Sequence, residues 1–323
     1  MTNPQICAVV GVMHQLAYTS PITRWGFFMD SKELLQQQLA EISEQQAAKT
    51  KPVELPKDIV IRYNAELQRM VNSIQQEINR SIVPQLKYLA PEYTADSWVD
   101  TITSAIALLR QRLSGNNFKR FAERLAANFI TDINTRNIQT MGKMFGSFGI
   151  DIMTINKQVT DFLQASVAEN VQLITSIQSQ YLDRVETLVL TNMRAGLRPS
   201  AIQQQLQDQF GITKNRARLI ARDQLSKASN GLAKKRMKSS GIKYWRWVTS
   251  KDQRVRNKHN DFAERVTKYG KGIYAMDAPP LNEKGQPVFP GDEVACRCIM
   301  QPVLESEVKR NQEKRLTNPS VNR

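Results

Sequence analysis

The chain has 323 residues, which accommodates roughly two domains, and a formal net charge of +15 that favours a polyanionic partner. Its three cysteines are too few for an extracellular disulfide framework, so we expect reduced thiols in a protein made in a cytoplasm. The N-terminal apolar run ICAVVGVM is far shorter than the roughly 18 residues of a membrane span. We therefore expect neither a signal peptide nor a transmembrane helix.

The N-terminal two thirds of the sequence is predicted to consist of long helices. Residues 1–95 are interpreted as a peripheral helical region with a Gln-rich segment, SKELLQQQLAEISEQQAAK, that breaks at KPVELP. Residues 96–210 are predicted to form a helical domain, because apolar side chains recur there at helical spacing. The three apolar series run from Trp98 to Leu113, from Phe118 to Ile133 and from about Thr160 to Arg194.

Two shorter helices are expected next. Gly196 can cap the long helix at its C-terminal end. Ser200 can begin a short helix that ends at Gly211, and Thr213 can begin another that extends to about Ser239. This second helix has a narrow face of small residues and carries its basic residues on the outside.

The C-terminal part changes from helical to mixed periodicity, so the fold class is mostly α with a C-terminal α+β domain. IKYWRWVT alternates as a strand, and KDQRVRNKHNDFAERV is typical of a helix. Trp245 and Trp247 share one strand face, where they could form part of the core or stack on nucleic acid bases. The expected strands lie around 242–249, 286–289 and 295–303; the domain covers 211–303, and a polar tail, expected to be a fraying helix, covers 304–323.

The positive charge is concentrated in one window. Between Ile212 and His259 there are fifteen Lys and Arg residues against two acids, a net charge of +13. This exceeds what solubility requires, so DNA or another polyanion is the expected partner and a solvated surface the alternative. The candidate phosphate-binding residues are Lys214, Arg218, Arg222, Lys234, Lys235, Arg236 and Lys238.

Cys296 and Cys298 lie one residue apart in PGDEVACRC, and on a strand both thiols would face the same side. With His259 they supply three ligands for zinc, and Asp252 or water could be the fourth. The alternatives are a metal-free packed or hydrogen-bonded cluster, or a catalytic thiol with His259 as its base. A redox pair is less suited, because one intervening residue strains a disulfide. Zinc is thus the one cofactor that the sequence suggests.

A second function class rests on the polar residues around His259. Asp252, Arg256 and His259 could serve phosphate chemistry, as in a nuclease, or NAD-directed chemistry, as in a toxin. Against an enzyme, there is no second histidine nearby and no carboxylate cluster for two metals. Arg254 or Arg256 is instead expected to pair with a carboxylate such as Asp252.

Four segments in a fixed order carry a family resemblance. LIARDQLSKASN, WVTSKDQRVRNKH, PP and VFPGDEVACRC together resemble the C-terminal domain of the phage Mu F-like head morphogenesis, or minor head protein, family over about Gly211 to Val303. Ala295 is a departure, since the family often has Asn there. The positions that match the family motif are Trp247, Asp252, Arg254, Arg256, His259, Pro290, Gly291, Cys296, Arg297 and Cys298.

The resemblance implies a non-enzymatic virion protein, a minor capsid component of a tailed phage that is made in the host cytoplasm. It implies a location inside the head near the portal. The expected partners are the portal protein, the major capsid or scaffold protein, and packaged double-stranded DNA, with no membrane. A long-helix region and a basic C-terminal domain are consistent with such contacts.

Overall fold

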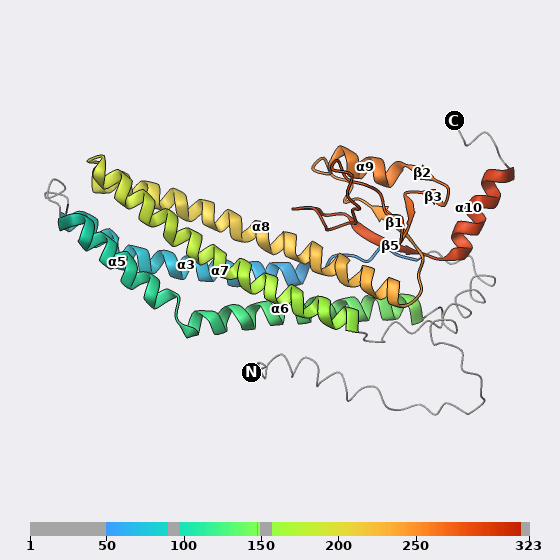
Figure 1. The fold of residues 1–323 in the computed structure, drawn as a ribbon, viewed down its shortest axis with the longest axis horizontal. Coiled ribbons are helices and arrows are strands. Elements are labelled where there is room, and N and C mark those ends of the chain that lie inside the picture. Colours follow the sequence, from blue (N-terminus) through green and yellow to red (C-terminus); the bar gives the residue numbers. More distant parts are fainter. Residues whose placement is uncertain (1–49, 90–96, 147, 149–156, 318–323) are drawn as a thin grey trace, which may run out of the picture. The chain divides into compact units, whose positions relative to one another are not determined.

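A computed structural model describes residues 50–89, 97–146, 148 and 157–317. The Gln-rich segment and Cys7 lie outside these residues. The helices are α3 (Lys57–Ser81), α4 (Val83–Leu89), α5 (Ser97–Leu113), α6 (Asn116–Gly146), α7 (Lys157–Arg194), α8 (Pro199–Ser239), α9 (Asn257–Glu264) and α10 (Glu305–Thr317). The strands are β1 (Tyr244–Val248), β2 (Val266–Thr267), β3 (Gly270–Lys271), β4 (Ile273–Ala275) and β5 (Ile299–Val303) (Figure 1).

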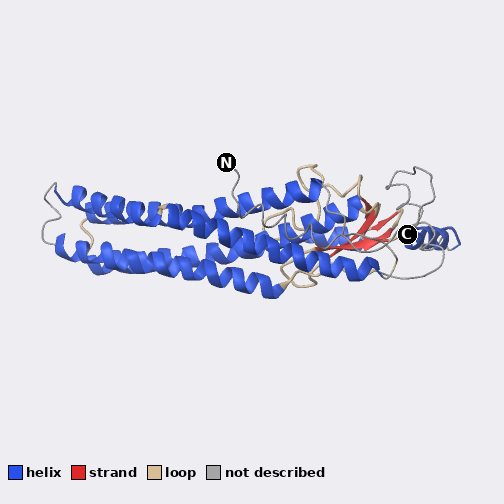
Figure 2. Ribbon diagram, turned by 90° about the horizontal axis from the view of Figure 1, so that it is seen from below, coloured by secondary structure: helices blue, strands red, loops and turns tan. Residues whose placement is uncertain are grey.

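The described residues form two compact units. The helical unit comprises residues 57–89, 97–129 and 164–225, and the mixed unit comprises residues 50–56, 130–146, 148, 157–163 and 226–317. All strands belong to the mixed unit (Figure 2). Long helices followed by a small α+β region confirm the predicted fold class.

The helical unit is built from the apolar repeats that the sequence shows. Buried side chains follow one another every three or four residues along α3, and α5 and α7 have similar stripes. The Tyr63 ring of α3 stacks on Phe129 of α6, with centroids 3.9 Å apart. At the end of α7, Gly196 has a φ of +71° and closes the helix, as predicted.

α8 differs from the expectation of two successive helices, since it continues through Gly211 without a break. The Thr213 hydroxyl does not cap a new helix. It donates to the Gln209 carbonyl one turn back, at 2.9 Å. A helical φ at Gly211 costs only about 1 kcal/mol relative to Ala, and packing on both sides can offset that cost.

The mixed unit contains a three-stranded antiparallel sheet in the order β4-β1-β5. β1 is central, and its alternation places Trp245 and Trp247 in the core, at 0% and 1% exposure. The aromatic pair is therefore part of the core and does not stack on bases. On the outer edge of β5, the Val53 amide donates to the Met300 carbonyl at 3.0 Å, so residues 50–53 cover that edge.

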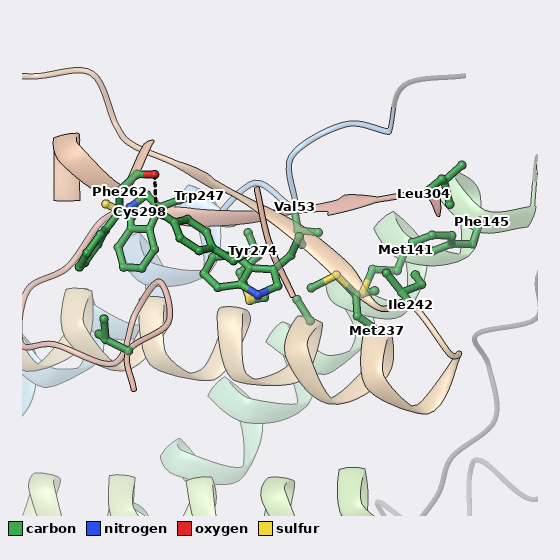
Figure 3. Packing of buried hydrophobic residues seen from close by; sticks show 14 of the residues in the cluster. Val53, Met141, Phe145, Met237, Ile242, Trp247, Phe262, Tyr274, Cys298 and Leu304 are labelled. Carbon is green, nitrogen blue, oxygen red and sulfur yellow. Dashed lines mark hydrogen bonds between the residues drawn. The ribbon is translucent and has the colours of Figure 1, made fainter. Parts of the chain in front are cut away.

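One hydrophobic cluster joins distant parts of the mixed unit. Figure 3 shows Trp247, Phe262 and Cys298 together at one end of this cluster and Tyr274 with Val53 in its middle. The other end is formed by side chains from α6, the end of α8 and the segments that follow α8 and β5: Met141, Phe145, Met237, Ile242 and Leu304. The sheet is thereby attached to helices far away in the sequence.

Several C-terminal elements are shorter than expected. The segment 286–289 forms a single bridge, Leu281 with Pro287, because the Asn282 carboxamide accepts the amides of Lys284 and Gln286 and fixes a turn. The helix expected over KDQRVRNKHNDFAERV is confined to α9.

The first part of the tail is a helix that packs on the mixed unit, whereas a fraying helix was expected. α10 buries Val308, and Glu307 pairs with Arg246 of β1 at 2.5 Å.

Candidate functional site

The motif residues converge on a buried cluster of two thiols and one imidazole. His259 lies on α9 with 3% exposure, and Cys296 and Cys298 are 3% and 2% exposed. The Nδ1 atom of His259 is 3.7 Å from the Cys296 Sγ and 3.6 Å from the Cys298 Sγ. These three atoms all lie within 4.8 Å of one another. The spatial grouping predicted from the sequence is therefore present.

The cysteines reach this position from a loop rather than from a strand. Ala295 has a φ of +59°, and the Cys296 amide donates to the Glu293 carbonyl at 3.0 Å, which closes a turn. The strand expected over 295–303 therefore begins only at Ile299. Both sulfur atoms still face His259 while the side chain between them points to Asp252.

A residue that sequence reasoning did not single out holds the other side of the imidazole. The carboxylate of Glu293 lies 3.0 Å from Nε2 of His259. Arg256 lies 3.6 Å from the same Glu293 oxygen and donates to the Val294 carbonyl at 2.8 Å. The imidazole is thus bracketed by two thiols and a carboxylate.

α8 fixes the loop from beneath through Asn230. The side-chain nitrogen of Asn230 donates to the Cys298 carbonyl at 3.1 Å, and the side-chain oxygen of Asn230 accepts from the Met300 backbone amide at 3.2 Å. Gly291 approaches α8 so closely that a Cβ there would lie 2.8 Å from the Ser226 carbonyl oxygen. Its amide donates to the Cys296 Sγ at 3.4 Å. Gly291 is therefore required by both its φ of +88° and its surroundings.

The electrostatics of the cluster separate the two thiols. The hydrogen bond from Cys298, together with that from His259, outweighs burial and lowers the pKa of Cys296. The hydrogen bond to Cys296 and burial raise the pKa of Cys298. Burial of His259 opposes its charged form, but Cys296 and Glu293 raise its pKa overall. Negative charge is therefore favoured on Cys296, with the neighbouring groups as donors.

Asp252 has a different partner from the one expected. Both of its carboxylate oxygens accept from the guanidinium of Arg297, and one also accepts the Arg254 amide at 2.9 Å. Neither Arg254 nor Arg256 provides the side-chain partner of Asp252. Arg297 and the Arg254 amide hold the pKa of Asp252 at about 2. The pair ties the turn after β1 to the cysteine loop.

This arrangement does not favour phosphate chemistry by Asp252, Arg256 and His259. Asp252 is engaged by Arg297, and Arg256 by Glu293 and Val294. His259 is buried with both ring nitrogens facing protein groups. The three side chains therefore do not converge on a shared substrate position.

The candidate phosphate-binding residues of α8 fall into two groups. Lys214, Arg218 and Arg222 follow one another at four-residue spacing in the helical unit, and both arginines are exposed. In the mixed unit, Lys238 is exposed and Lys235 is half-buried. Six of the seven proposed residues are at least partly accessible, among them Lys234, whose ammonium lies 4.0 Å above the Phe289 ring.

Arg236 is the exception among these basic residues. It is 3% exposed, and its guanidinium donates to the side-chain oxygens of Asn134 and Asn137 on α6. Burial lowers the pKa of Arg236 to about 10. Its basic sequence neighbours suggested a surface role. On α8, however, the Arg236 side chain points into the interior of the mixed unit. Arg236 therefore serves packing and does not contact phosphate.

Fold and site together define a mostly helical protein whose small α+β unit encloses a Cys–His cluster. Residues 183–301 match the family model described as Phage Mu protein F like protein. This match includes α8, β1, α9 and all three cluster residues, and it confirms the resemblance predicted for the C-terminal domain. The C-terminal part of the chain is therefore similar to this family over residues 183–301.

The chain is also similar to a protein of Haemophilus influenzae (strain ATCC 51907 / DSM 11121 / KW20 / Rd) named "Uncharacterized protein". The two are 28% identical over 283 residues, which cover 86% of this chain. The chain spans 59% of the length of that relative. No solved structure matches the chain. Within the described residues, none of the helices has the combination of length and apolarity that is needed to cross a bilayer.

Proposed function

We propose that this protein is a minor capsid protein that acts in the head morphogenesis of a tailed phage. The observation that carries the proposal is the match of residues 183–301 to the family described as Phage Mu protein F like protein. The role in head morphogenesis is what the resemblance to this family implies. The motif residues are the ones that organise the mixed unit: Trp247 is in its core, and Asp252 pairs with Arg297. A structural role agrees with a site in which these groups bind one another.

Contact with the portal protein, the major capsid protein or the scaffold is assigned in this proposal to the helical unit. Several large apolar side chains are exposed there: Ile61 at 66%, Tyr88 at 77%, Leu108 at 53% and Ile212 at 46%. Exposed apolar side chains on long helices are suited to helix-mediated protein contacts. The proposed location is inside the head, near the portal.

Packaged double-stranded DNA is the second proposed partner. Arg218, Arg222 and Lys238 are exposed on α8, and the net charge of the whole chain is +15. Flexible cations on a helix surface bind phosphate without reading sequence. The expected interaction is electrostatic and independent of DNA sequence.

Deletion of the gene from a phage or prophage tests the morphogenesis role. We expect the yield of DNA-filled heads to fall and to recover when the full chain is supplied in trans. Full yield of DNA-filled heads without the chain would contradict the role.

A complementing chain with Ile61→Gln and Leu108→Gln, both exposed positions, tests the helical contact, and Lys51→Gln is an exposed control outside the helical unit.

DNA binding is tested by measuring the affinity of the full chain for duplex DNA across salt concentrations. The slope of log K against log salt should become shallower by about 0.9 for each phosphate contact that is removed. Arg218→Gln with Arg222→Gln, and separately Lys238→Gln, should produce this change, whereas Lys51→Gln should not. A DNA affinity that does not depend on salt would contradict phosphate binding and would favour an acidic protein partner instead.

A further inference from the structure

We propose that His259, Cys296 and Cys298 bind one zinc ion, which holds the loop before β5 against α9. The proposal concerns the stability of the mixed unit and does not rest on the role of the protein in a phage head.

The separations fit tetrahedral coordination of one ion. Zinc bonds of about 2.3 Å to sulfur and about 2.05 Å to nitrogen, at the tetrahedral angle, place S and N about 3.6 Å apart. The Nδ1 atom of His259 lies 3.7 Å from one sulfur and 3.6 Å from the other. Small side-chain adjustments would suffice to bring all three ligands around one ion.

The near-equality of the two distances favours a metal over a simple hydrogen-bonded cluster. A single N–H on Nδ1 points well at only one acceptor, so a hydrogen-bonded imidazole should lie nearer to one thiol. A lone pair on Nδ1 can instead bind an ion that both sulfurs share. Soft thiolates with imidazole form a donor set that is typical of zinc.

The groups around the ligands support the same assignment. Glu293 accepts from Nε2 at 3.0 Å, so that once zinc displaces the proton on Nδ1, the Nδ1 lone pair of a neutral imidazole faces both sulfur atoms. A carboxylate on the far nitrogen is the usual orienting partner of a histidine that binds zinc. The Gly291 amide donates to the Cys296 Sγ at 3.4 Å, and Asn230 fixes the backbone at Cys298. The ligands are thus oriented by the Glu293 carboxylate, by the backbone amide of Gly291 and by Asn230 of α8.

Three protein atoms leave one tetrahedral position for water. Asp252 does not supply this ligand, because both of its oxygens accept from Arg297. When Zn²⁺ binds, two thiolates and one neutral imidazole become its ligands, and two protons leave to solvent. Only bonds to the released protons are broken, two Zn–S bonds and one Zn–N bond form, and no change of oxidation state occurs.

Elemental analysis of the purified full-length chain is the direct test. We expect about one zinc per chain, removable by a strong chelator with a fall in melting temperature, because binding free energy adds to folding. Cys296→Ser and Cys298→Ser should each lose the stoichiometric metal. Cys7→Ser is the matched control at the third cysteine of the chain and should retain it.

Glu293→Gln provides a variant that keeps all three ligands. Its apparent zinc affinity, measured by competition with a chelating dye, should fall by about 10- to 100-fold. Cobalt added to the metal-free wild-type chain should give the intense visible absorption of a tetrahedral site and a sulfur-to-cobalt charge-transfer band. Less than half a zinc per chain, with no uptake of zinc or cobalt by the reduced protein, would overturn the proposal, and so would stoichiometric binding that survives Cys296→Ser.

Discussion

The helical and mixed units are held together in different ways. In the helical unit, long amphipathic helices share a buried network in which the Tyr63 hydroxyl donates to Asn170, and Asn170 donates to Gln224, each at 3.0 Å. In the mixed unit, short elements meet around Trp247 and the Cys–His cluster, and their contacts join residues far apart in the sequence. Stabilising contacts are therefore spread along the helices of the helical unit, whereas in the mixed unit they are concentrated around Trp247 and the Cys–His cluster.

This difference predicts where single substitutions have most effect. A helix with many buried apolar positions loses one contact among several when one side chain changes. A small sheet with a central aromatic pair loses much of its packing at once. The substitutions below separate the two cases, and each is measured as a change in the free energy of unfolding.

The largest loss is expected from Trp247→Ala. The side chain is 1% exposed and lies 5.0 Å from the His259 ring and 4.9 Å from the Phe262 ring, centroid to centroid. Removing it should destabilise the mixed unit by about 3–5 kcal/mol in denaturant unfolding. Ile106→Val in the helical unit should cost only about 1 kcal/mol. Equal losses would refute the proposed concentration of stability.

Arg236→Ala should destabilise the mixed unit by about 3 kcal/mol, because it leaves the buried oxygens of Asn134 and Asn137 without this donor. Lys238→Ala, two residues away and exposed, should change stability by less than about 0.5 kcal/mol. Thermal and urea unfolding of both variants measure the contrast. A neutral Arg236→Ala would show that this arginine is a surface residue after all.

Asn170→Ala tests the polar network of the helical unit. It removes the partner of the Tyr63 hydroxyl and of Gln224, and the expected loss is about 2 kcal/mol. Burial raises the pKa of Tyr63, so its phenol stays neutral and needs a hydrogen-bond partner. Asn215→Ala, at an exposed position on α8, is the control. An unchanged urea midpoint for Asn170→Ala would argue against the network.

The smallest expected change is a gain. Ala295 has a φ of +59°, a conformation that costs an alanine roughly 1 kcal/mol and that asparagine tolerates better. Ala295→Asn should therefore raise the melting temperature slightly, with a gain of about 0.5–1 kcal/mol. Ala295→Val, which is β-branched, should lower it. The reverse order would mean that the loop does not adopt this turn.

Local sequence patterns predicted the helices and strands better than they predicted the tertiary contacts of these elements. Apolar spacing predicted α5, α6 and α7, and strict alternation predicted β1, because each depends on a few neighbouring residues. The continuity of α8 through Gly211 was not predicted, since tertiary packing decided it. A glycine is a plausible helix end in any sequence, and only the fold shows that this one is not.

The candidate site was predicted in its members but not in its surroundings. Two thiols one residue apart and a histidine on the preceding helix were enough to expect a cluster. Glu293 and the Arg297 partner of Asp252 depend on a loop turn at Ala295 that no periodicity encodes. The burial of Arg236 was missed for a related reason, since a run of basic residues does not reveal which one faces inward.

Quantification of the chain by mass spectrometry in purified heads, before and after release of the DNA, tests directly whether it is a minor capsid protein. We expect the chain to be present in intact heads at a copy number far below that of the major capsid protein. Its level before and after release shows whether it leaves with the DNA. Absence of the chain from purified heads that contain DNA would contradict its assignment as a minor capsid protein.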